Sequence, residues 1–270
     1  MIPAGKTNVI PMRIMVLSES KAMDGFGAEH GLSFLIETDH KKVLLDTGAS
    51  DLFLRNAQTM GINTEGVDNI VLSHGHFDHG DGLQFMDGLP LLCHPGCFVS
   101  RFRKRGNRNI GMALSRDEIE DRFDLTVSRE PVQIYNNLVF LGEVPRLNDF
   151  EAKSTKYVLE SGDDDFMVDD SGLVYISQKG LVIISGCAHS GICNMTEHAR
   201  RITGVDRVEA VIGGFHLSAV NEQTRKTITY LKDMGVEKVC PSHCTMDPAL
   251  SFFYDEFGTK EVLAGAILEF

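Results

Sequence analysis

The sequence predicts a mixed α/β fold in which a β-rich core is covered by helices. Two patterns carry this prediction. The first half of the chain is rich in β-hairpin signals, and the second half ends in alternating helical and strand-like segments. The chain has 270 residues and is 43% hydrophobic, so it can bury a sizeable core without disulfide bonds. Periodicity alone leaves open whether the strands form one sheet or two.

Each element follows from its own local pattern. Strand-like segments are apolar or alternate with period two, and Asn136-Asn137 and Gln178-Lys179-Gly180 are turn sequences that we expect to join hairpins. Helical segments place apolar residues three and four positions apart. We expect strands at 13–17, 32–37, 42–48, 69–72, 90–94, 132–141 (a pair), 173–177, 181–185, 208–212, 238–241 and 261–270. We expect helices at 50–60, 194–202 and 222–234.

Composition restricts the class of protein. With 26 basic and 38 acidic residues the formal net charge is −12, which argues against non-specific nucleic-acid binding. No apolar run approaches the roughly 18 residues of a membrane span, and residues 1–6 lack the apolar core of a secretory signal. Size and composition suit one large domain or two small ones. Without a low-complexity linker or a fixed repeat, we expect one cytoplasmic domain over 1–270. Its partner would be a small-molecule substrate, and a homo-oligomer stays open.

The cysteines recur beside histidines. In a cytoplasmic chain of this size we expect them to be reduced thiols. Small buried apolar side chains at strand ends are the simpler interpretation for most of them. They form three pairs, each enclosing a histidine: Cys93 and Cys97 around His94, Cys187 and Cys193 around His189, and Cys240 and Cys244 around His243.

Residues 73–80, Ser-His-Gly-His-Phe-Asp-His-Gly, are the most informative segment. His74, His76, Asp78 and His79 lie within six positions, directly after an apolar strand-like segment. Neutral imidazole and carboxylate are ligands that borderline divalent metals prefer. A tight loop at a strand end can hold such ligands rigidly. The segment therefore predicts a metal site.

Three later strand ends carry further candidate ligands. Cys187 and His189 follow the strand 181–185, His216 follows 208–212, and His243 follows 238–241. Strands of one sheet end at a common edge, so residues just past those ends can converge on one site. A single strand-end histidine is more often a structural hydrogen-bonding group. Three of them together with the histidine loop favour a shared metal site.

The motif His-x-His-x-Asp-His, preceded by Asp46-Thr47-Gly48 at the end of an early strand, resembles the metallo-β-lactamase superfamily. The resemblance covers roughly residues 13–270. It implies a four-layer αββα sandwich with two metal ions at one edge. By this resemblance His74 and His76 hold the first metal ion, and Asp78 and His79 hold the second.

The remaining ligands depart from the family pattern. Gly186-Cys187 stands where the family has Gly-Asp with a bridging aspartate, and no histidine follows the strand that ends near residue 141. The resemblance then implies His189 at the first metal and His243 at the second. Cys187 either replaces the bridging carboxylate as a thiolate or only lines the site. Zinc is the expected metal, with iron or manganese as alternatives. Asp46 either orients a ligand histidine from behind or only begins a turn.

The implied chemistry is attack by a hydroxide that two metal ions share, since each ion lowers the pKa of bound water toward neutrality. Asp78 would steer this hydroxide as a catalytic residue. His216 is a further catalytic candidate at the edge of the site. The first hypothesis is therefore a metal-dependent hydrolase of a small phosphorylated or ester-type substrate.

A closer resemblance is to the group around the archaeal synthase that joins a pterin diphosphate to a ribofuranosylaminobenzene phosphate. It implies an alternative, a transferase that releases diphosphate. A third hypothesis, kept open by Cys187, is a non-hydrolytic iron protein for redox chemistry or sensing. The matching segments are residues 29–34, 142–146, 169–170, 186–192 and 213–216.

A basic segment fits a phosphorylated substrate. Residues 101–108 hold five cations in a chain of net charge −12, and arginines near a glycine-containing loop can bind phosphate. A solvated helix face or an interface patch is the alternative. Asp169-Asp170 are expected to be turn residues, with a lid or ion-binding role as the alternative. The candidate substrate-binding residues are Arg101, Arg103, Arg105, Arg146 and His30.

Overall fold

The computed structural model describes residues 11–38 and 40–270, and the described chain forms two compact units. Unit 1 comprises residues 130–154 and 170–261. Unit 2 comprises the described residues up to 129 together with 155–169 and 262–270. The expectation about residues 1–6 lies outside the described residues. The expectation of a single domain over residues 1–270 stays a prediction.

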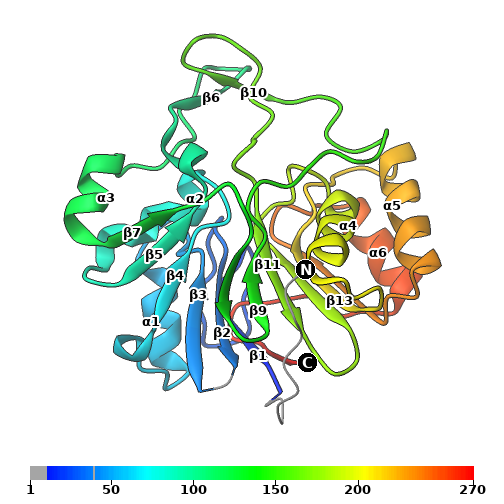
Figure 1. Cartoon of the computed structure of the whole chain (residues 1–270), viewed down its shortest axis with the longest axis horizontal. Helices are drawn as coiled ribbons and strands as arrows, with labels where there is room; N and C mark the ends of the chain where they lie inside the picture. Colours follow the sequence, from blue (N-terminus) through cyan, green and yellow to red (C-terminus); the bar gives the residue numbers. More distant parts are fainter. Residues whose placement is uncertain (1–10, 39) are drawn as a thin grey trace. The chain divides into compact units, whose positions relative to one another are not determined.

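Unit 2 is built on a seven-stranded sheet with the order β15-β1-β2-β3-β4-β5-β7 (Figure 1). The strands from β15 to β3 pair antiparallel, and those from β3 to β7 pair parallel. The strands are β1 (Arg13–Ser18), β2 (Ser33–Thr38), β3 (Lys41–Leu45), β4 (Asn69–Val71), β5 (Pro90–Cys93), β7 (Asp124–Val127) and β15 (Ile267–Glu269).

Short helices and a separate ribbon complete unit 2. Helix α1 (Leu52–Thr59) inserts Phe53 and Ala57 into a core with Leu35 and Leu44 of the sheet. Strands β6 (Arg101–Arg103) and β10 (Tyr157–Leu159) pair with each other in a two-stranded ribbon at the top of Figure 1. The other helical segments are α2 (Phe77–Gly80), α3 (Arg116–Arg122), η1 (Thr64–Gly66), η2 (Asp81–Phe85) and η3 (Pro95–Phe98).

Unit 1 is built on a six-stranded sheet with the order β14-β13-β12-β11-β9-β8. The pairs from β8 to β12 are antiparallel, whereas β12, β13 and β14 run parallel. The strands are β8 (Val132–Tyr135), β9 (Leu138–Phe140), β11 (Gly172–Ile176), β12 (Leu181–Ser185), β13 (Val208–Gly214) and β14 (Lys238–Ser242).

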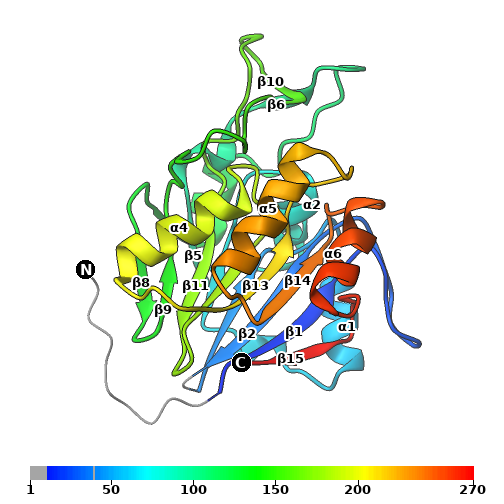
Figure 2. The same cartoon turned by 90° about the vertical axis from the view of Figure 1, so that its right-hand side faces the viewer.

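Three helices cover one face of this sheet: α4 (Ile192–Thr203), α5 (Glu222–Asp233) and α6 (Ala249–Phe257) (Figure 2). Met195 of α4 and Phe253 of α6 are fully buried in a core with Ile183, Val211 and Val239 of the strands. Burial of such large apolar side chains, each contributing about 1.5–3 kcal/mol, holds the helices on the sheet.

The parallel strands determine where the site residues lie within each unit. In unit 1, Ser185 pairs with Gly213 and Gly214 pairs with Ser242, so β12, β13 and β14 end side by side. In unit 2, Leu45 pairs with Val71, so the segments after β3 and β4 also leave the sheet together. Residues of the candidate site follow each of these strand ends.

Most predicted elements are confirmed, and the differences have local reasons. The hairpins β8–β9 and β11–β12 form at the two predicted turns. The predicted strand 261–270 shortens to β15, preceded by a single bridge at Ala264 and by Gly265 with φ +93°. Helix α3 was not predicted because Ile119 is its one buried residue, although Ser115 and Glu118 form a capping box before it. Helix α6 and strands β6, β7 and β10 were also not predicted. Among the described residues, no helix is long and apolar enough to cross a membrane.

Candidate metal centre

The histidine loop of unit 2 connects β4 to α2, and it gathers its side chains in a small volume. His74, His76, Asp78 and His79 are all buried. The ring centroid of His74 lies 4.6 Å from that of His76 and 4.2 Å from that of His79. His74 Nε2 and His76 Nδ1 are 2.9 Å apart. The loop thus brings together the imidazoles of His74, His76 and His79, which were predicted to be ligands.

Asp46 orients this loop from behind. Nδ1 of His79 donates to Asp46 Oδ2 at 2.7 Å, and both side chains are fully buried. The Ser73 backbone N–H donates to Asp46 Oδ1 at 2.7 Å, and the Ser73 hydroxyl donates to Oδ2 at 2.6 Å. The same hydroxyl lies 2.9 Å from His74 Nδ1. Because Nδ1 of His79 is engaged by the carboxylate, Nε2 is the nitrogen that would bind a metal ion.

A second buried aspartate, Asp169, braces the loop at Gly75. The Gly75 N–H donates to Asp169 Oδ2 at 2.8 Å, and Arg101 Nη1 donates to Asp169 Oδ1 at 3.0 Å. A Cβ at Gly75 would lie 1.9 Å from the carbonyl oxygen of Cys97, so the close approach of the two backbones requires glycine. Asp169 lies in a turn, as expected, and its fully buried side chain also braces the histidine loop.

Asp78 has an exposed partner. Its Oδ2 lies 3.1 Å from Nε2 of His30, whose side chain is 57% exposed while that of Asp78 is 9% exposed. The pair connects a buried carboxylate to the solvent through one imidazole. His30 therefore lies beside the histidine loop, in contact with one of the candidate ligands.

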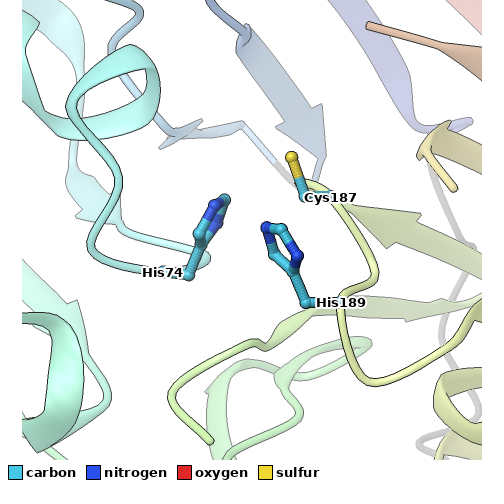
Figure 3. Close-up of side chains that lie close together, drawn as sticks. All are labelled: His74, Cys187 and His189. Atoms are coloured by element: carbon cyan, nitrogen blue, oxygen red, sulfur yellow. The ribbon is translucent and has the colours of Figure 1, made fainter. Parts of the chain in front are cut away.

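In unit 1, the loop after β12 carries Cys187 and His189. The side chains of these two residues, together with that of His74 from the loop after β4 in unit 2, are drawn in Figure 3. Within unit 1, the ring centroids of His189 and His216 are 4.3 Å apart. Ala188, His216 and His243 have φ values of +48°, +52° and +52°. Non-glycine residues in this left-handed region cost free energy and cluster at functional sites.

Two thiols and a histidine form a group inside unit 1. The ligand atoms of Cys187, His216 and Cys244 lie within 4.8 Å of one another. The backbone N–H of His216 donates to Cys244 Sγ at 3.3 Å. Burial by itself would raise the pKa of the Cys244 thiol, but hydrogen bonds with Cys187 and His216 outweigh it and hold that pKa well below its usual range. Cys244 was not among the predicted ligands, because most cysteines were interpreted as small buried apolar side chains; its position directly after His243 is the signal that could have found it.

Two buried carboxylates within unit 1 brace the loop that carries Cys187 and His189 and the start of helix α4 that follows it. Asp170 Oδ2 accepts hydrogen bonds from the Ser190 N–H at 2.9 Å and from the Ser190 hydroxyl at 2.5 Å. Glu151 accepts from the N–H groups of Cys193 and Asn194 at 3.0 and 2.9 Å, at the N-terminus of α4. Burial raises the pKa of both carboxyls. No pattern in the sequence marked Glu151, because it reaches the helix from a loop about 40 residues earlier.

The predicted phosphate-binding arginines differ in environment. Arg103 and Arg105 are exposed at the β6–β10 ribbon. Arg103 ends strand β6 and Arg105 lies in the turn after it, so this segment is not a helix face. Arg101 is 1% exposed; its guanidinium contacts Asp169, lies 3.5 Å from Asp165 and donates to the Gly96 carbonyl. Its surroundings are those of a structural ion pair, and its contact with substrate stays a prediction. Arg146 Nη1 donates to the Val144 carbonyl at 2.8 Å.

The donor atoms fit a borderline divalent metal. Unit 2 offers imidazoles and the Asp78 carboxylate, with His79 held by a buried carboxylate in the manner of metal-ligating histidines. Unit 1 offers imidazoles and two thiols. Nitrogen, sulfur and carboxylate donors are the ligands that zinc accepts, and iron also accepts them.

The chain is similar to proteins of a known superfamily. Residues 26–85, which include the histidine loop, match the family model of the metallo-beta-lactamase superfamily. A relative from Methanocaldococcus jannaschii, described as 7,8-dihydropterin-6-methyl-4-(beta-D-ribofuranosyl)-aminobenzene-5'-phosphate synthase, is 36% identical over 285 residues. The match covers 96% of this chain and 97% of the relative. An uncharacterised protein of the same organism is 32% identical, with 88% of this chain and 92% of that protein covered.

A solved structure shows the same fold. Tm1679, described as a metal-dependent hydrolase of the beta-lactamase superfamily, superposes with a TM-score of 0.84 at 31% sequence identity. The match covers 96% of this chain and 99% of that chain. It confirms the expected α/β metallo-β-lactamase fold.

Proposed function

We propose, from the premise that the chain belongs to the metallo-β-lactamase superfamily, that it is a metal-dependent hydrolase of a small phosphorylated or ester-type molecule. The observation that carries the proposal is the buried histidine loop, in which Asp46 orients His79 and contacts Ser73 beside His74. Preoriented imidazoles with a supporting carboxylate are the arrangement typical of metal-binding histidines, which supports the proposal.

The superfamily pattern implies two sets of ligands for two divalent ions, most simply Zn²⁺, with iron or manganese as the alternatives. When bound, the ions would activate water and polarise the substrate. By that pattern the first ion would take His74, His76 and His189, and the second would take Asp78, His79 and His243. Cys187 would either replace the bridging carboxylate as a thiolate or only line the site.

Asp78 and His30 would accept the proton of the attacking water and transfer it to solvent. Asp78 Oδ2 lies 3.1 Å from Nε2 of His30, and the His30 side chain is 57% exposed. A proton taken up at this carboxylate can pass to Nε2 of His30 and from there to bulk water. His216, whose ring lies against that of His189, is the candidate on the unit 1 side for positioning the leaving group.

Cations would hold the phosphorylated part of the substrate. Arg103 and Arg105 are exposed. Arg146 is half-buried, and its Nη1 donates a hydrogen bond to the Val144 carbonyl. Arginine can bind phosphate through two parallel hydrogen bonds. These three are therefore stronger candidates for substrate binding than the buried Arg101.

Hydrolysis of bis-p-nitrophenyl phosphate by the zinc-loaded or manganese-loaded protein tests the proposal. We expect His76→Ala to abolish turnover, and His40→Asn to leave it unchanged. His40 is an exposed turn residue with φ +62°, a conformation that asparagine tolerates. Turnover that persists in His76→Ala, or a wild-type protein that binds no metal, would contradict the proposal.

A second candidate function is supported by the 36% identity to the archaeal synthase over almost the whole chain. It is a condensation of a pterin diphosphate with an aminobenzene ribofuranosyl phosphate, with release of diphosphate. The two candidates separate in one assay. Diphosphate release that requires the aminobenzene partner supports condensation, whereas loss of phosphate groups without that partner supports hydrolysis.

Metal analysis addresses the third hypothesis. Zinc, iron and manganese would be quantified in the wild type and in Cys187→Ala. Iron with a visible absorption band that disappears in Cys187→Ala would favour the non-hydrolytic iron protein, whereas zinc or manganese in both proteins would favour the enzyme.

A further inference from the structure

We propose that Cys187, His216 and Cys244 form a thiolate-containing metal-binding group within unit 1, which selects zinc-like ions over Mg²⁺ and Mn²⁺. The inference rests on the proposed function only through Cys187, which both share. Cys244 and His216 are not ligands in the superfamily pattern described above. The group would supply soft sulfur donors where the superfamily pattern has carboxylate oxygen.

The topology of unit 1 brings the three residues together. Each lies two positions beyond the last residue of a strand: Cys187 after β12, His216 after β13 and Cys244 after β14. These strands are parallel neighbours that end side by side, so the three positions share one sheet edge. Their ligand atoms accordingly lie within 4.8 Å of one another. An ion in contact with all three needs donor atoms about 3–4 Å apart, so small side-chain rotations suffice.

The backbone makes room for this group at Gly214. A Cβ on Gly214 would lie 2.6 Å from Cys244 Sγ and 3.1 Å from the Cα of Cys187. Any other residue would therefore push the two thiols away from their present positions. The absence of a side chain here is what allows both sulfur atoms to approach one strand end.

A hydrogen bond to sulfur supports a thiolate. The His216 N–H donates to Cys244 Sγ at 3.3 Å, and the left-handed backbone of His216, with φ +52°, presents this N–H. Backbone hydrogen bonds to sulfur are characteristic of thiolates that bind metal, because they stabilise the negative charge. Cys187 is buried, whereas His216 and Cys244 are half-buried, so an ion has access from one side.

The chemistry of the donors predicts the ion. Two thiolates and one imidazole form a set that Zn²⁺, Co²⁺ and Cd²⁺ accept and that hard ions such as Mg²⁺ do not. Three protein ligands leave a coordination position for water or substrate. Binding releases the thiol protons, so affinity increases with pH.

Cobalt provides a direct test, because thiolate-to-cobalt charge transfer absorbs in the near ultraviolet and imidazole or carboxylate ligation does not. The metal-free full chain would be titrated with Co²⁺ in the presence of a phosphine reductant. We expect a thiolate band in the wild type, loss of part of it in Cys187→Ser and in Cys244→Ser, and its complete loss in the double variant. His216→Asn, which suits φ +52°, should keep the band and need more Co²⁺ to saturate it.

The matched control is Cys240→Ser. Cys240 lies in β14, four residues before Cys244, and is outside the group. It should keep the full band, as should His76→Ala, which removes a ligand in unit 2. Circular dichroism of each variant establishes that the fold is retained.

The outcomes separate this inference from the proposed function. A full band in the double cysteine variant, or no band in a wild type that binds Co²⁺, would overturn the inference and leave the hydrolase proposal standing. A band that persists in His76→Ala while hydrolysis is absent from the wild type would support the inference and contradict the hydrolase. A reductant-resistant disulfide between Cys187 and Cys244, found by mass spectrometry, would also overturn the inference.

Discussion

The carboxylate of Asp46 accepts a hydrogen bond from Nδ1 of His79 at 2.7 Å, and neither side chain is exposed to solvent. Asp46 has φ +58° and also accepts from the Ser73 N–H. This strained, buried carboxylate would determine which nitrogen of His79 can bind a metal ion.

Replacing Asp46 should therefore weaken metal binding. In Asp46→Asn the side chain keeps its shape and asparagine tolerates the positive φ, but the negative charge is lost. We expect zinc affinity to fall about 10–100-fold, measured by competition with a chromophoric chelator. The control is Asp68→Asn, which removes a surface aspartate paired with Lys41. Unchanged affinity in Asp46→Asn would show that Asp46 only shapes the turn.

Gly75 should be essential for the geometry of the histidine loop. In Gly75→Ala the new Cβ meets the Cys97 carbonyl oxygen at 1.9 Å, so one of the two backbones must move. We expect a loss of about 1–3 kcal/mol in the free energy of unfolding, measured by urea denaturation, together with weaker zinc binding. Gly66→Ala is the control, because its Cβ would have no neighbour nearer than Lys42 Nζ at 3.8 Å. Equal stability of the two variants would refute the prediction.

Arg101 should contribute to stability more than to substrate binding. Its removal in Arg101→Met leaves the Asp169 carboxylate buried without a counter-charge, which typically costs about 3–5 kcal/mol. Thermal and urea denaturation would measure this cost. The double variant Arg101→Met/Asp169→Asn should recover part of it. Arg105→Ala, at an exposed position, should raise KM for a phosphorylated substrate while leaving stability unchanged. A raised KM with unchanged stability in Arg101→Met would instead show that Arg101 binds substrate.

Glu151 should make stability depend on pH. Burial raises the pKa of Glu151 in the folded protein above its ordinary value of 4.5, against the opposing effect of hydrogen bonds from Cys193 and Asn148. The folded state therefore binds this proton more tightly than the unfolded state. The resulting contribution to stability is complete below the unfolded pKa and is lost as the pH rises through the folded pKa.

Urea denaturation at a series of pH values above 4.5 checks this sign. The free energy of unfolding of the wild type should decrease relative to that of Glu151→Gln as the pH increases. Glu65→Gln, at an exposed position, should follow the wild type. A wild-type curve parallel to that of Glu151→Gln would contradict the raised pKa.

His30 should act on turnover and not on metal binding. Its Nε2 contacts Asp78 Oδ2 at 3.1 Å from a position that is 57% exposed. In His30→Gln we expect kcat to fall about 100-fold or more with unchanged zinc content, because an exposed proton acceptor is lost. A loss of zinc with kcat per bound metal unchanged would instead make His30 a support for Asp78.

The sequence by itself determined the local elements and half of the candidate site. Apolar periodicity and turn residues act over a few positions, so β8–β9, β11–β12 and α5 could be predicted close to their observed bounds. His74, His76, Asp78 and His79 lie within six positions, so their proximity needed no knowledge of the fold.

Tertiary structure decided everything that depends on which distant segments are neighbours. The contact between Asp46 and His79 spans 33 positions, and Cys244 reaches Cys187 across 57 positions. Both follow from the order and register of parallel strands, which no local pattern encodes. The burial of Arg101 against Asp169 and the contact of Glu151 with α4 likewise depend on which distant segments pack together. An arginine in a basic run has the same local chemistry whether solvent or a buried carboxylate faces it, and only the packed chain determines which.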